Sequence, residues 1–411
     1  MKLNYLIFIL TVIVGFTGFS QEENSEDKKE NPFSIKWDNG FKVESQDKNF
    51  KLKFGGRIMV DHAYFFQDED MDANFGELEV KSGTEFRRAR FYMGGTVYKN
   101  VDFKLQVDFA GGLVLLKDAY IGINGVPGVG TIRVGNVKEP FRLDALTSSK
   151  YITFMERVLA TDFAQERNSG ILVFNDFFNK RFSAQLGAFR NSSANGNDIT
   201  ANDGYVITGR ITGLLINNPE KKQLLHAGIG HSFRNTDSNS FKISSRPEAH
   251  LGPKYINTGV IENIKHANLT NFELAFVYKS FSLQGEYITG NYKKMDFDPI
   301  DNYVFNSYYG QVSYYITGES KNYKSSYSGF GRVKPKHNFG KDGAGAFEVA
   351  VRLSNSDLNS EDIFGGEQRD ITFGLNWYLN PVTRIMINYD FVKVTDIGNA
   401  SNIQARMQID F

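Results

Sequence analysis

The chain ends on residues 403–411, Ile-Gln-Ala-Arg-Met-Gln-Ile-Asp-Phe, in which apolar and polar residues alternate without a break. As a β-strand, this stretch has an apolar face that ends at Phe411 and a polar face that includes Arg406 and Asp410. A soluble protein seldom leaves such a strand as an open edge, because an unpaired amphipathic edge promotes aggregation. In a membrane both edges must be paired, since lipid offers no hydrogen bonds to backbone groups. We therefore predict that the last strand closes a transmembrane β-barrel.

The composition of the chain fits this prediction. The 411 residues include 36 Phe, 20 Tyr and 39 Gly but only 2 Trp, a mixture typical of strands and turns. The negative mean hydropathy excludes a helical membrane bundle. Lys+Arg and Asp+Glu balance at 47 each, so the overall charge offers no attraction for nucleic acid. The sequence has no Cys, which excludes disulfides, thiolate metal sites and a lipid-modified amino terminus.

The amino terminus has the layout of a secretory signal. Lys2 precedes an apolar run at residues 3–19, and the small residues Gly18 and Ser20 precede Gln21. An uncleaved anchor helix is the alternative, but the run is near the short limit for spanning a membrane. We predict three parts, a signal peptide (1–20), a flexible periplasmic lead-in (21–48) and the barrel (49–411).

Stretches with a period of two residues recur along the rest of the chain, and none repeats at helical spacing with convincing caps. In residues 101–109 the apolar side chains take one face, while Asp102, Lys104 and Asp108 take the other. The predicted fold is all-β, an antiparallel transmembrane barrel of sixteen strands. The predicted strands are 50–65, 85–98, 101–110, 115–124, 131–138, 170–177, 181–190, 204–216, 223–233, 271–278, 281–288, 306–317, 345–354, 370–379, 383–394 and 403–411.

The predicted connections alternate between short and long, as expected for a barrel with short inner turns and long outer loops. The tight turns are 99–100, 179–180, 279–280 and 380–381. The longer segments are 67–84, 139–169, 191–203, 234–270, 289–305, 355–369 and 395–402. One long segment, 318–344, falls on the inner side in this count. We expect Tyr323, Tyr327, Phe330 and Phe339 to order it there.

Several short motifs stand out between residues 50 and 411. They are Glu85-Phe-Arg-Arg-Ala-Arg90, Lys117-Asp-Ala-Tyr120, Phe154-Met-Glu-Arg157, Tyr315-Ile-Thr-Gly-Glu319, Phe330-Gly-Arg-Val-Lys-Pro335, Gly374-Leu-Asn-Trp-Tyr-Leu-Asn-Pro381 and Arg406-Met-Gln-Ile-Asp-Phe411. Together they resemble the phosphate-selective porin O and P family. The resemblance implies a sixteen-stranded trimeric porin in the bacterial outer membrane, with the third outer loop folded into the lumen and basic residues along an anion path.

The candidate path residues come from one loop and one strand. Segment 139–169 is the third outer loop in our count and therefore the natural constriction. Facing it, the second strand places two arginines on the parity that points into the lumen. The candidates are Arg88, Arg90, Arg142, Ser148, Ser149 and Lys150.

Four further basic residues, Arg87, Arg133, Arg332 and Lys334, are weaker candidates. Arg87 falls on the lipid-facing parity, so it must lie beyond the bilayer, at a subunit contact or in a β-bulge. Arg332 and Lys334 belong to the inner segment, where a solvated loop is the alternative reading.

Arginine suits an oxyanion because its planar, permanently charged group donates two parallel hydrogen bonds. A conducting pore must replace the hydration of the ion at several weak sites and hold it tightly at none. The competing interpretation is that wall arginines only pair with wall carboxylates such as Asp118 and Glu348. We expect passive diffusion of small anions, such as phosphate or similar oxyanions; a general or organic-solute porin is the alternative.

An outer-membrane enzyme would need a Ser or Asp nucleophile beside a His on the barrel wall, and the sequence predicts no such pairing, so no enzymatic activity, cofactor or metal is expected. The acidic residues between Asp68 and Glu79 have nearly the spacing of a calcium loop, but Ala73 stands where the sharp turn needs Gly. We expect a surface acidic loop there. The expected partners are outer-membrane lipid, two further copies in a homotrimer, small anions, and the outer-membrane assembly machinery through Phe411.

Overall fold

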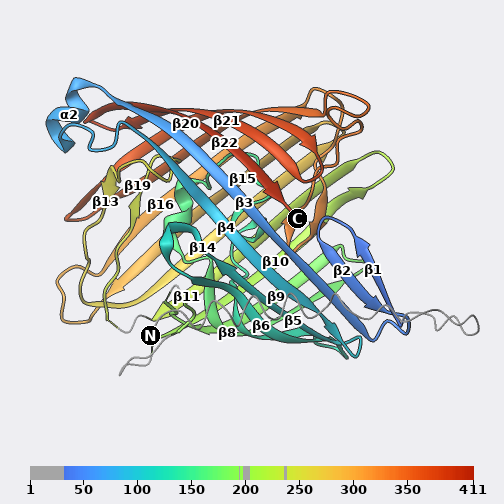
Figure 1. Ribbon diagram of the computed structural model, residues 1–411. Helices are drawn as coiled ribbons and strands as arrows, with labels where there is room; N and C mark the ends of the chain where they lie inside the picture. Colours follow the sequence, from blue (N-terminus) through green and yellow to red (C-terminus); the bar gives the residue numbers. More distant parts are fainter. Residues whose placement is uncertain (1–31, 194, 198–203, 236–237) are drawn as a thin grey trace, which may run out of the picture.

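The computed structural model describes residues 32–193, 195–197, 204–235 and 238–411. Sixteen antiparallel strands form one closed wall (Figure 1). The last strand, β22 (Gly398–Asp410), pairs with β3 (Phe50–Gln67), from Asp410 opposite Arg57 to Ala400 opposite Gln67. The predicted closure of the barrel by the terminal strand is confirmed, and the predicted number of strands is correct.

The remaining strands of the wall follow one another in chain order, and each pairs with its neighbours. They are β4 (Ser82–Val97), β5 (Val101–Asp108), β6 (Leu115–Val126), β7 (Gly130–Lys138), β8 (Arg167–Phe177), β9 (Phe182–Arg190), β10 (Tyr205–Asn218), β11 (Gln223–Asn235), β14 (Ile264–Tyr278), β15 (Phe281–Lys294), β16 (Asn302–Tyr315), β19 (Ala346–Ser360), β20 (Ile363–Asn380) and β21 (Thr383–Val394).

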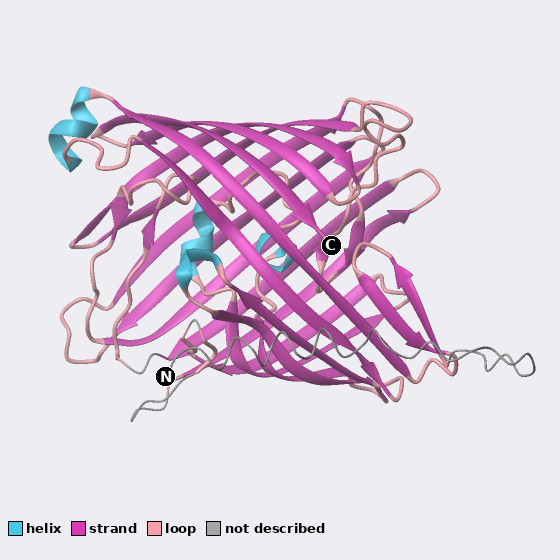
Figure 2. Cartoon of the chain, in the orientation of Figure 1, coloured by secondary structure: helices cyan, strands magenta, loops and turns pink. Residues whose placement is uncertain are grey.

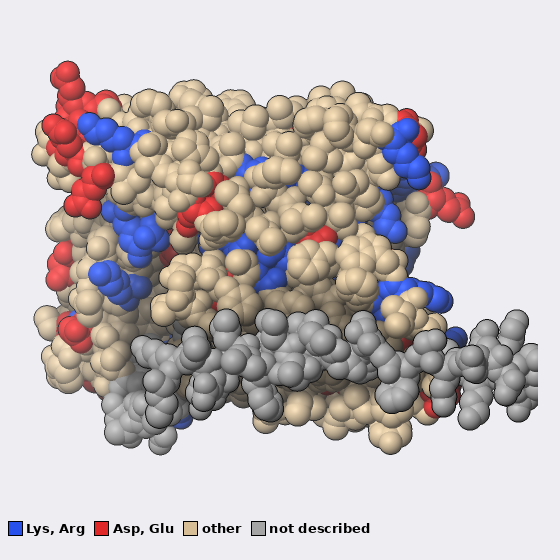
Figure 3. All heavy atoms as spheres, viewed as in Figure 1, with Lys and Arg blue, Asp and Glu red and all other residues tan. Residues whose placement is uncertain are grey.

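The two faces of the wall differ as the alternation predicts. On β22, Ile403 and Met407 are 40% and 57% exposed, whereas Arg406 and Asp410 are buried. The exposed face of each strand is apolar, so it is the face that meets lipid, and the polar face points into the barrel. Figure 3 shows that the visible side of the barrel is mostly uncharged and that acidic residues gather at one end.

The strands run further than predicted at the outer rim. Residues 355–369, expected to be a long loop, instead continue β19 and β20 to a tight turn at Glu361 and Asp362, where Glu361 has a φ of 52°. Most of these residues are polar, and the apolar ones, Leu358, Ile363 and Phe364, do not alternate along the strands, because a strand that stands in water above the bilayer needs no continuous apolar side. The period-two pattern is therefore lost although the strand continues.

A hairpin precedes the barrel, and the sequence analysis did not identify it. It consists of β1 (Phe33–Trp37) and β2 (Phe41–Ser45), and β2 pairs with β3 at residues 51–54. The predicted signal peptide at 1–20 lies outside the described residues.

In the described ranges, helices are few and short (Figure 2). They are α2 (Glu69–Phe75), α3 (Leu143–Leu146), η1 (Ala110–Gly112) and η2 (Leu159–Phe163). Among the described residues, no helix is long and apolar enough to cross a membrane. The acidic run at Asp68 forms α2, because the Asp68 carboxylate caps the helix by accepting a hydrogen bond from the Met71 N–H at 2.9 Å. This run is therefore a capped surface helix and not a calcium-type loop.

Residues 318–344 lie on the inner rim, as predicted. They leave β16 after Tyr315, beside the tight turn that joins β14 to β15, and contain β17 (Tyr323–Ser325) and β18 (Gly329–Phe330). Tyr323 and Phe330 make an edge-to-face ring contact at 5.7 Å. On the outer side, the connection between β11 and β14 carries the small pair β12 (Ser244–Ser245) and β13 (Ile256–Asn257).

The largest apolar cluster joins two outer connections to the wall. Phe141, Val158 and Phe163 of segment 139–166, together with Ile256 and Ile261, pack against inward-facing side chains of β14, β15 and β16. This packing covers inward-facing side chains of β14–β16, and a cavity lies on the other side of the barrel, against β3–β8.

Candidate functional site: a basic cavity against β3–β8

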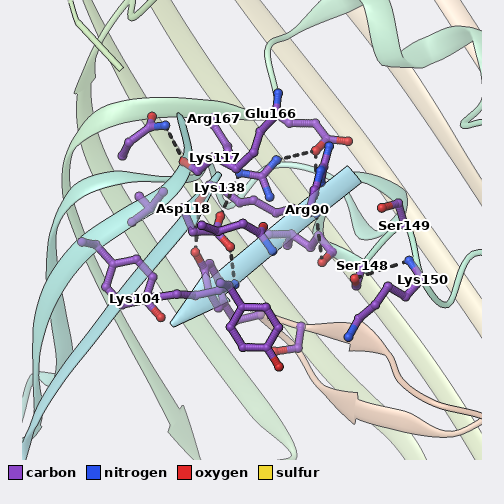
Figure 4. A pocket seen from close by; sticks show the side chains of 18 of the residues that line it. Arg90, Lys104, Lys117, Asp118, Lys138, Ser148, Ser149, Lys150, Glu166 and Arg167 are labelled. Atoms are coloured by element: carbon purple, nitrogen blue, oxygen red, sulfur yellow. Dashed lines mark hydrogen bonds and ion pairs between the residues drawn. The ribbon is translucent and has the colours of Figure 1, made fainter. Parts of the chain in front are cut away.

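A cavity of about 930 Å³ lies between strands β3–β8 and segments 139–166 and 318–344 (Figure 4). Among its described lining residues, thirteen are Lys or Arg, and three, Asp118, Glu166 and Asp176, are acidic. The neutral sequence thus contains a strongly basic interior space. An anion is the species that such a space favours.

A β-bulge turns two consecutive arginines of β4 into the barrel. Met59 pairs with Arg88 and Val60 pairs with Phe86, which leaves Arg87 without a partner on β3. Arg87 donates two hydrogen bonds of 2.8 Å to the Glu156 carboxylate, and Arg88 is 3.7 Å from the same group. The bulge, one of the three placements considered for Arg87, is confirmed. By turning Arg87 toward Glu156, the bulge attaches residues 139–166 to the wall.

Several other cavity arginines are also paired with carboxylates. Arg90 Nε is 2.6 Å from Asp108 Oδ2, and Arg133 is 2.9 Å from Asp102 with its guanidinium over the Tyr120 ring at 4.4 Å. Asp118 pairs with both Lys104 and Arg167. These pairs match the competing interpretation from the sequence, in which wall arginines neutralise wall carboxylates.

Four lining cations have no carboxylate partner among the described residues: Lys53, Arg57, Lys117 and Lys324. Arg57, which is buried, donates a hydrogen bond of 2.7 Å to Ser149 Oγ and lies 3.5 Å from Ser148 Oγ. Because Ser149 Oγ accepts that bond, its own hydrogen remains able to donate to another group. Arg57 and the two serines therefore present charge and neutral donors at one place.

Lys117 reaches the cavity through a second bulge. Leu105 pairs with Ala119 and Val107 pairs with Leu116, so two residues of β6, Lys117 and Asp118, lie opposite Gln106 alone. As in β4, the extra residue disrupts the alternation and adds a cation to the inward face.

Lys150 lies outside the strands, on segment 139–166, and lines the same cavity. Its ammonium is 3.0 Å from Asp410 Oδ2. Burial lowers the pKa of Lys150 to about 8, even though Asp410 favours the charged form. Lys150 is therefore charged at neutral pH and loses its charge in mildly alkaline solution.

Hydrogen bonds attach segment 139–166 to strands all around the barrel. The carbonyls of Ile152, Thr153 and Glu156 accept bonds of 2.9, 2.9 and 3.1 Å from Arg384 on β21, Asn376 on β20 and Arg352 on β19. On β15, Glu286 accepts bonds from the backbone N–H groups of Leu143 and Asp144 at 2.9 and 2.7 Å.

The inner segment 318–344 meets segment 139–166 from the opposite rim. Lys321 donates to Thr153 Oγ1 at 2.7 Å, and the Phe330 N–H donates to Thr147 Oγ1 at 3.3 Å. Tyr327 stacks on Phe174 of β8 at 4.8 Å. The floor of the cavity thus comes from a segment that the sequence placed correctly but whose contacts it did not predict.

The structure brings most of the predicted path residues together, but not all. Arg88, Arg90, Ser148, Ser149 and Lys150 line the cavity, as do Arg87 and Arg133. Three others do not line it. Arg142 donates to the carbonyls of Ala160 and Thr161, Arg332 pairs with Asp410, and Lys334 is exposed.

Sequence reasoning missed Lys53, Arg57, Lys117 and Lys324. Arg57 and Lys53 share the inward parity of β3, so the alternation on that strand could have identified them. Lys117 could not have been found in this way, because a bulge places it.

Comparisons with known proteins agree with the barrel fold. The family model of phosphate-selective porin O and P matches residues 53–411. Porin O of Pseudomonas aeruginosa is 26% identical over 401 residues, which cover 89% of this chain and 88% of that protein. An uncharacterized protein of Caulobacter vibrioides is 28% identical over 413 residues, with 92% and 78% covered.

Two solved structures share the fold at low sequence identity. The anion-selective porin from Comamonas acidovorans superposes with a TM-score of 0.55 at 15% identity, covering 88% of this chain and 100% of that chain. A loop L8 deletion mutant of OmpT from Vibrio cholerae gives a TM-score of 0.56 at 10% identity, with 88% and 100% covered.

Proposed function

The chain belongs to the phosphate-selective porin O and P family, and from that premise we propose that it is an outer-membrane porin for the passive diffusion of small anions, phosphate in particular. The observation that carries the proposal is the surplus of cations in the cavity. Lys53, Arg57 and Lys117 have no carboxylate partner among the described residues, so their charge is available to a passing ion.

Arg57 and the two serines form the part of the path that suits a tetrahedral oxyanion best. The guanidinium of Arg57 offers charge in a fixed planar group, and Ser148 and Ser149 offer hydroxyl donors beside it. These donors are already oriented when an anion arrives, so they can replace part of its hydration shell. Lys53 and Lys117 supply further cations elsewhere in the cavity, so an ion can pass between several weak sites rather than stop at one.

Segment 139–166 occupies the lumen in this proposal, as the family resemblance implies. Its support is the set of hydrogen bonds that the segment makes with inward-facing side chains of β15, β19, β20 and β21. Because β15 lies across the barrel from β3 whereas β21 is separated from β3 by β22 alone, a segment bonded to both strands crosses the barrel and narrows the path to the cavity side.

Blocking of chloride current by phosphate in a planar bilayer tests this function. We expect stepped conductance that falls when phosphate is added, because both anions use Arg57 and its neighbours and phosphate binds there more strongly. Chloride current that is unaffected by phosphate would remove phosphate from the proposal, and a cation-conducting pore would reject the anion path entirely.

A general or organic-solute porin remains the second candidate, because a cavity of about 930 Å³ is large for a single phosphate. Liposome swelling with neutral sugars distinguishes the two: rapid swelling supports the general porin, and slow swelling together with phosphate block supports the anion porin.

A homotrimer and recognition of the carboxyl terminus complete the proposal. Strands β5, β7 and β9 have only 8, 9 and 9 residues, against 18 in β3 and β20. Strands of this length barely span the bilayer. We therefore place the contact with a neighbouring copy at this part of the wall. Phe411 forms backbone hydrogen bonds with Gly56 in the closed barrel, so the assembly machinery would have to bind it before closure.

A further inference from the structure

The β1–β2 hairpin continues the barrel wall at the inner rim. β22 stops pairing with β3 at Arg57, and β2 then pairs with the same edge of β3, with Phe41 opposite Phe54 and Val43 opposite Leu52. The turn of the hairpin adjoins the end of the last strand, because a Cβ added at Gly40 would lie 3.2 Å from the Phe411 carbonyl carbon. At the inner rim, the hairpin therefore occupies the edge of β3 that β22 occupies in the rest of the barrel.

The two faces of the hairpin have opposite character. Ile35, Trp37 and Phe41 share the face that continues the lipid-facing side of β3, and they are 70%, 56% and 54% exposed. Trp37 and Phe41 pack edge to face at 4.9 Å. Lys36 and Lys42 lie on the other face, where Lys42 is opposite the cavity residue Lys53.

Exposed aromatic residues also mark the inner turns elsewhere on this rim. Tyr98, in the turn between β4 and β5, is 67% exposed, and Phe178, in the turn between β8 and β9, is 79% exposed. Amphipathic aromatic rings at the ends of membrane strands are favoured at the boundary between lipid tails and headgroups. With Trp37 and Phe41, the hairpin extends this ring of exposed aromatic residues along the inner rim to the part of β3 that β22 does not cover.

We propose that the β1–β2 hairpin is a membrane-interface anchor, with Ile35, Trp37 and Phe41 immersed in the lipid leaflet at the inner rim and Lys36 and Lys42 turned toward the water-filled mouth. The occupant of the apolar face is lipid, because that face is continuous with the lipid-facing surface of β3 through Leu52 and Phe54. The anchor is separate from the proposed anion path. The hairpin would anchor this rim in the same way whichever ion the pore conducts.

The chain has only two tryptophans, Trp37 and Trp377, so each can be followed alone. In Trp377→Phe, the remaining Trp37 reports on the hairpin; in Trp37→Phe, the remaining Trp377 of β20 is the control on the wall. Each variant is placed in phosphatidylcholine vesicles brominated either near the glycerol backbone or near the chain ends. We expect Trp37 to lose most of its emission to bromine near the glycerol backbone and less to bromine near the chain ends.

Two results would overturn the proposal. Quenching of Trp37 by aqueous acrylamide but not by brominated lipid would show that the hairpin hangs in water. Protection from both quenchers would show that protein, such as a second copy, covers it.

A matched pair of substitutions then tests the face of the hairpin, in the Trp377→Phe background. Ile35→Asp should abolish lipid quenching of Trp37, whereas Lys36→Asp, on the next residue and the opposite face, should preserve it. Equal effects of both substitutions would contradict the assignment of lipid to one face.

Discussion

Arg57 on β3 and Arg210 on β10 are both buried arginines that point into the barrel, yet their partners differ. Arg210 donates to both oxygens of Glu273 at 3.1 Å, and the side chains of this pair are fully buried. Within the described part of the chain, the Arg57 guanidinium contacts serine hydroxyls and no carboxylate. Around Arg210 the lumen is packed, whereas Arg57 opens on the cavity.

The same contrast holds for the two sides of the lumen. On the paired side, Arg234 and Arg352 bind Glu139 and Glu248 respectively, and each of these charges is buried. On the cavity side, thirteen lining cations face three lining acids in the described residues. Inward-facing arginines therefore do not mark an ion path by themselves. The path requires a surplus of positive charge together with free space.

The largest expected effect comes from breaking a buried pair on the paired side. Arg210→Met removes the guanidinium bound to the buried Glu273 carboxylate, which keeps His226 Nε2 at 2.7 Å as its remaining partner among the described residues, and should destabilise the barrel by about 3–5 kcal/mol. The measurement is the temperature at which the folded band is lost in a heat-modifiability gel. Phosphate block of the protein that still folds should equal that of the wild type. The double variant Arg210→Met/Glu273→Leu is the control, because it removes both charges and should recover much of the stability. Lost phosphate block in that double variant would mean that the paired side also carries ions.

The next effect concerns phosphate binding at Arg57. Arg57→Gln removes a charge-assisted hydrogen bond of about 1.5–3 kcal/mol, so phosphate should block chloride current roughly tenfold to a hundredfold less strongly. Arg57→Lys, which keeps the charge but loses the planar group, should fall between the variant and the wild type. Block that is unchanged in Arg57→Gln would take this residue out of the path.

A smaller effect, of opposite sign, is expected when a paired cation is released. Asp108→Asn removes the negative charge beside Arg90 but retains an oxygen able to accept the backbone bonds from Ala89 and Ala110. Arg90, like Arg57, then has no carboxylate partner among the described residues. Phosphate block should become roughly tenfold stronger, which is the effect of one modest electrostatic interaction. Weaker block would show that Arg90 is a structural group whose release damages the wall.

The smallest effect is a pH dependence from Lys150. Its pKa is lowered to about 8, so the residue is cationic below that pH and neutral above it. The preference for anions should therefore decline as the pH rises from 7 to 9. Chloride is the suitable probe, because its own charge does not change with pH. Lys150→Arg should flatten the profile, and a profile that is equally steep in this variant would assign the titration to another group.

The sequence predicted the barrel because lipid imposes a strict rule on it. Every strand that crosses the bilayer must present apolar residues at alternate positions, and the sixteen strands could be recognised from that pattern alone. Strands outside the bilayer are not subject to this rule, and the sequence did not predict them. The outer extensions of β19 and β20 stand in water, and the hairpin at residues 33–45 precedes the first strand that closes the wall.

The candidate site was predicted less completely, for a different reason. Ser148, Ser149 and Lys150 were found because they lie on one long loop, and Arg88 and Arg90 because they follow the alternation. The bulges at Arg87 and Lys117 each break that alternation by one residue. Whether an inward arginine has a carboxylate partner depends on side chains from distant strands, which a pattern along one strand does not contain.

The central claim is that the unpaired cations of the cavity side make the pore selective for anions. Reversal potentials across a planar bilayer with a potassium chloride gradient test it most directly, with the wild type compared with Arg57→Gln/Lys117→Gln. We predict a potential close to that of chloride for the wild type and a clear shift toward zero for the double variant. A wild-type potential on the potassium side, or identical potentials for both proteins, would contradict the claim.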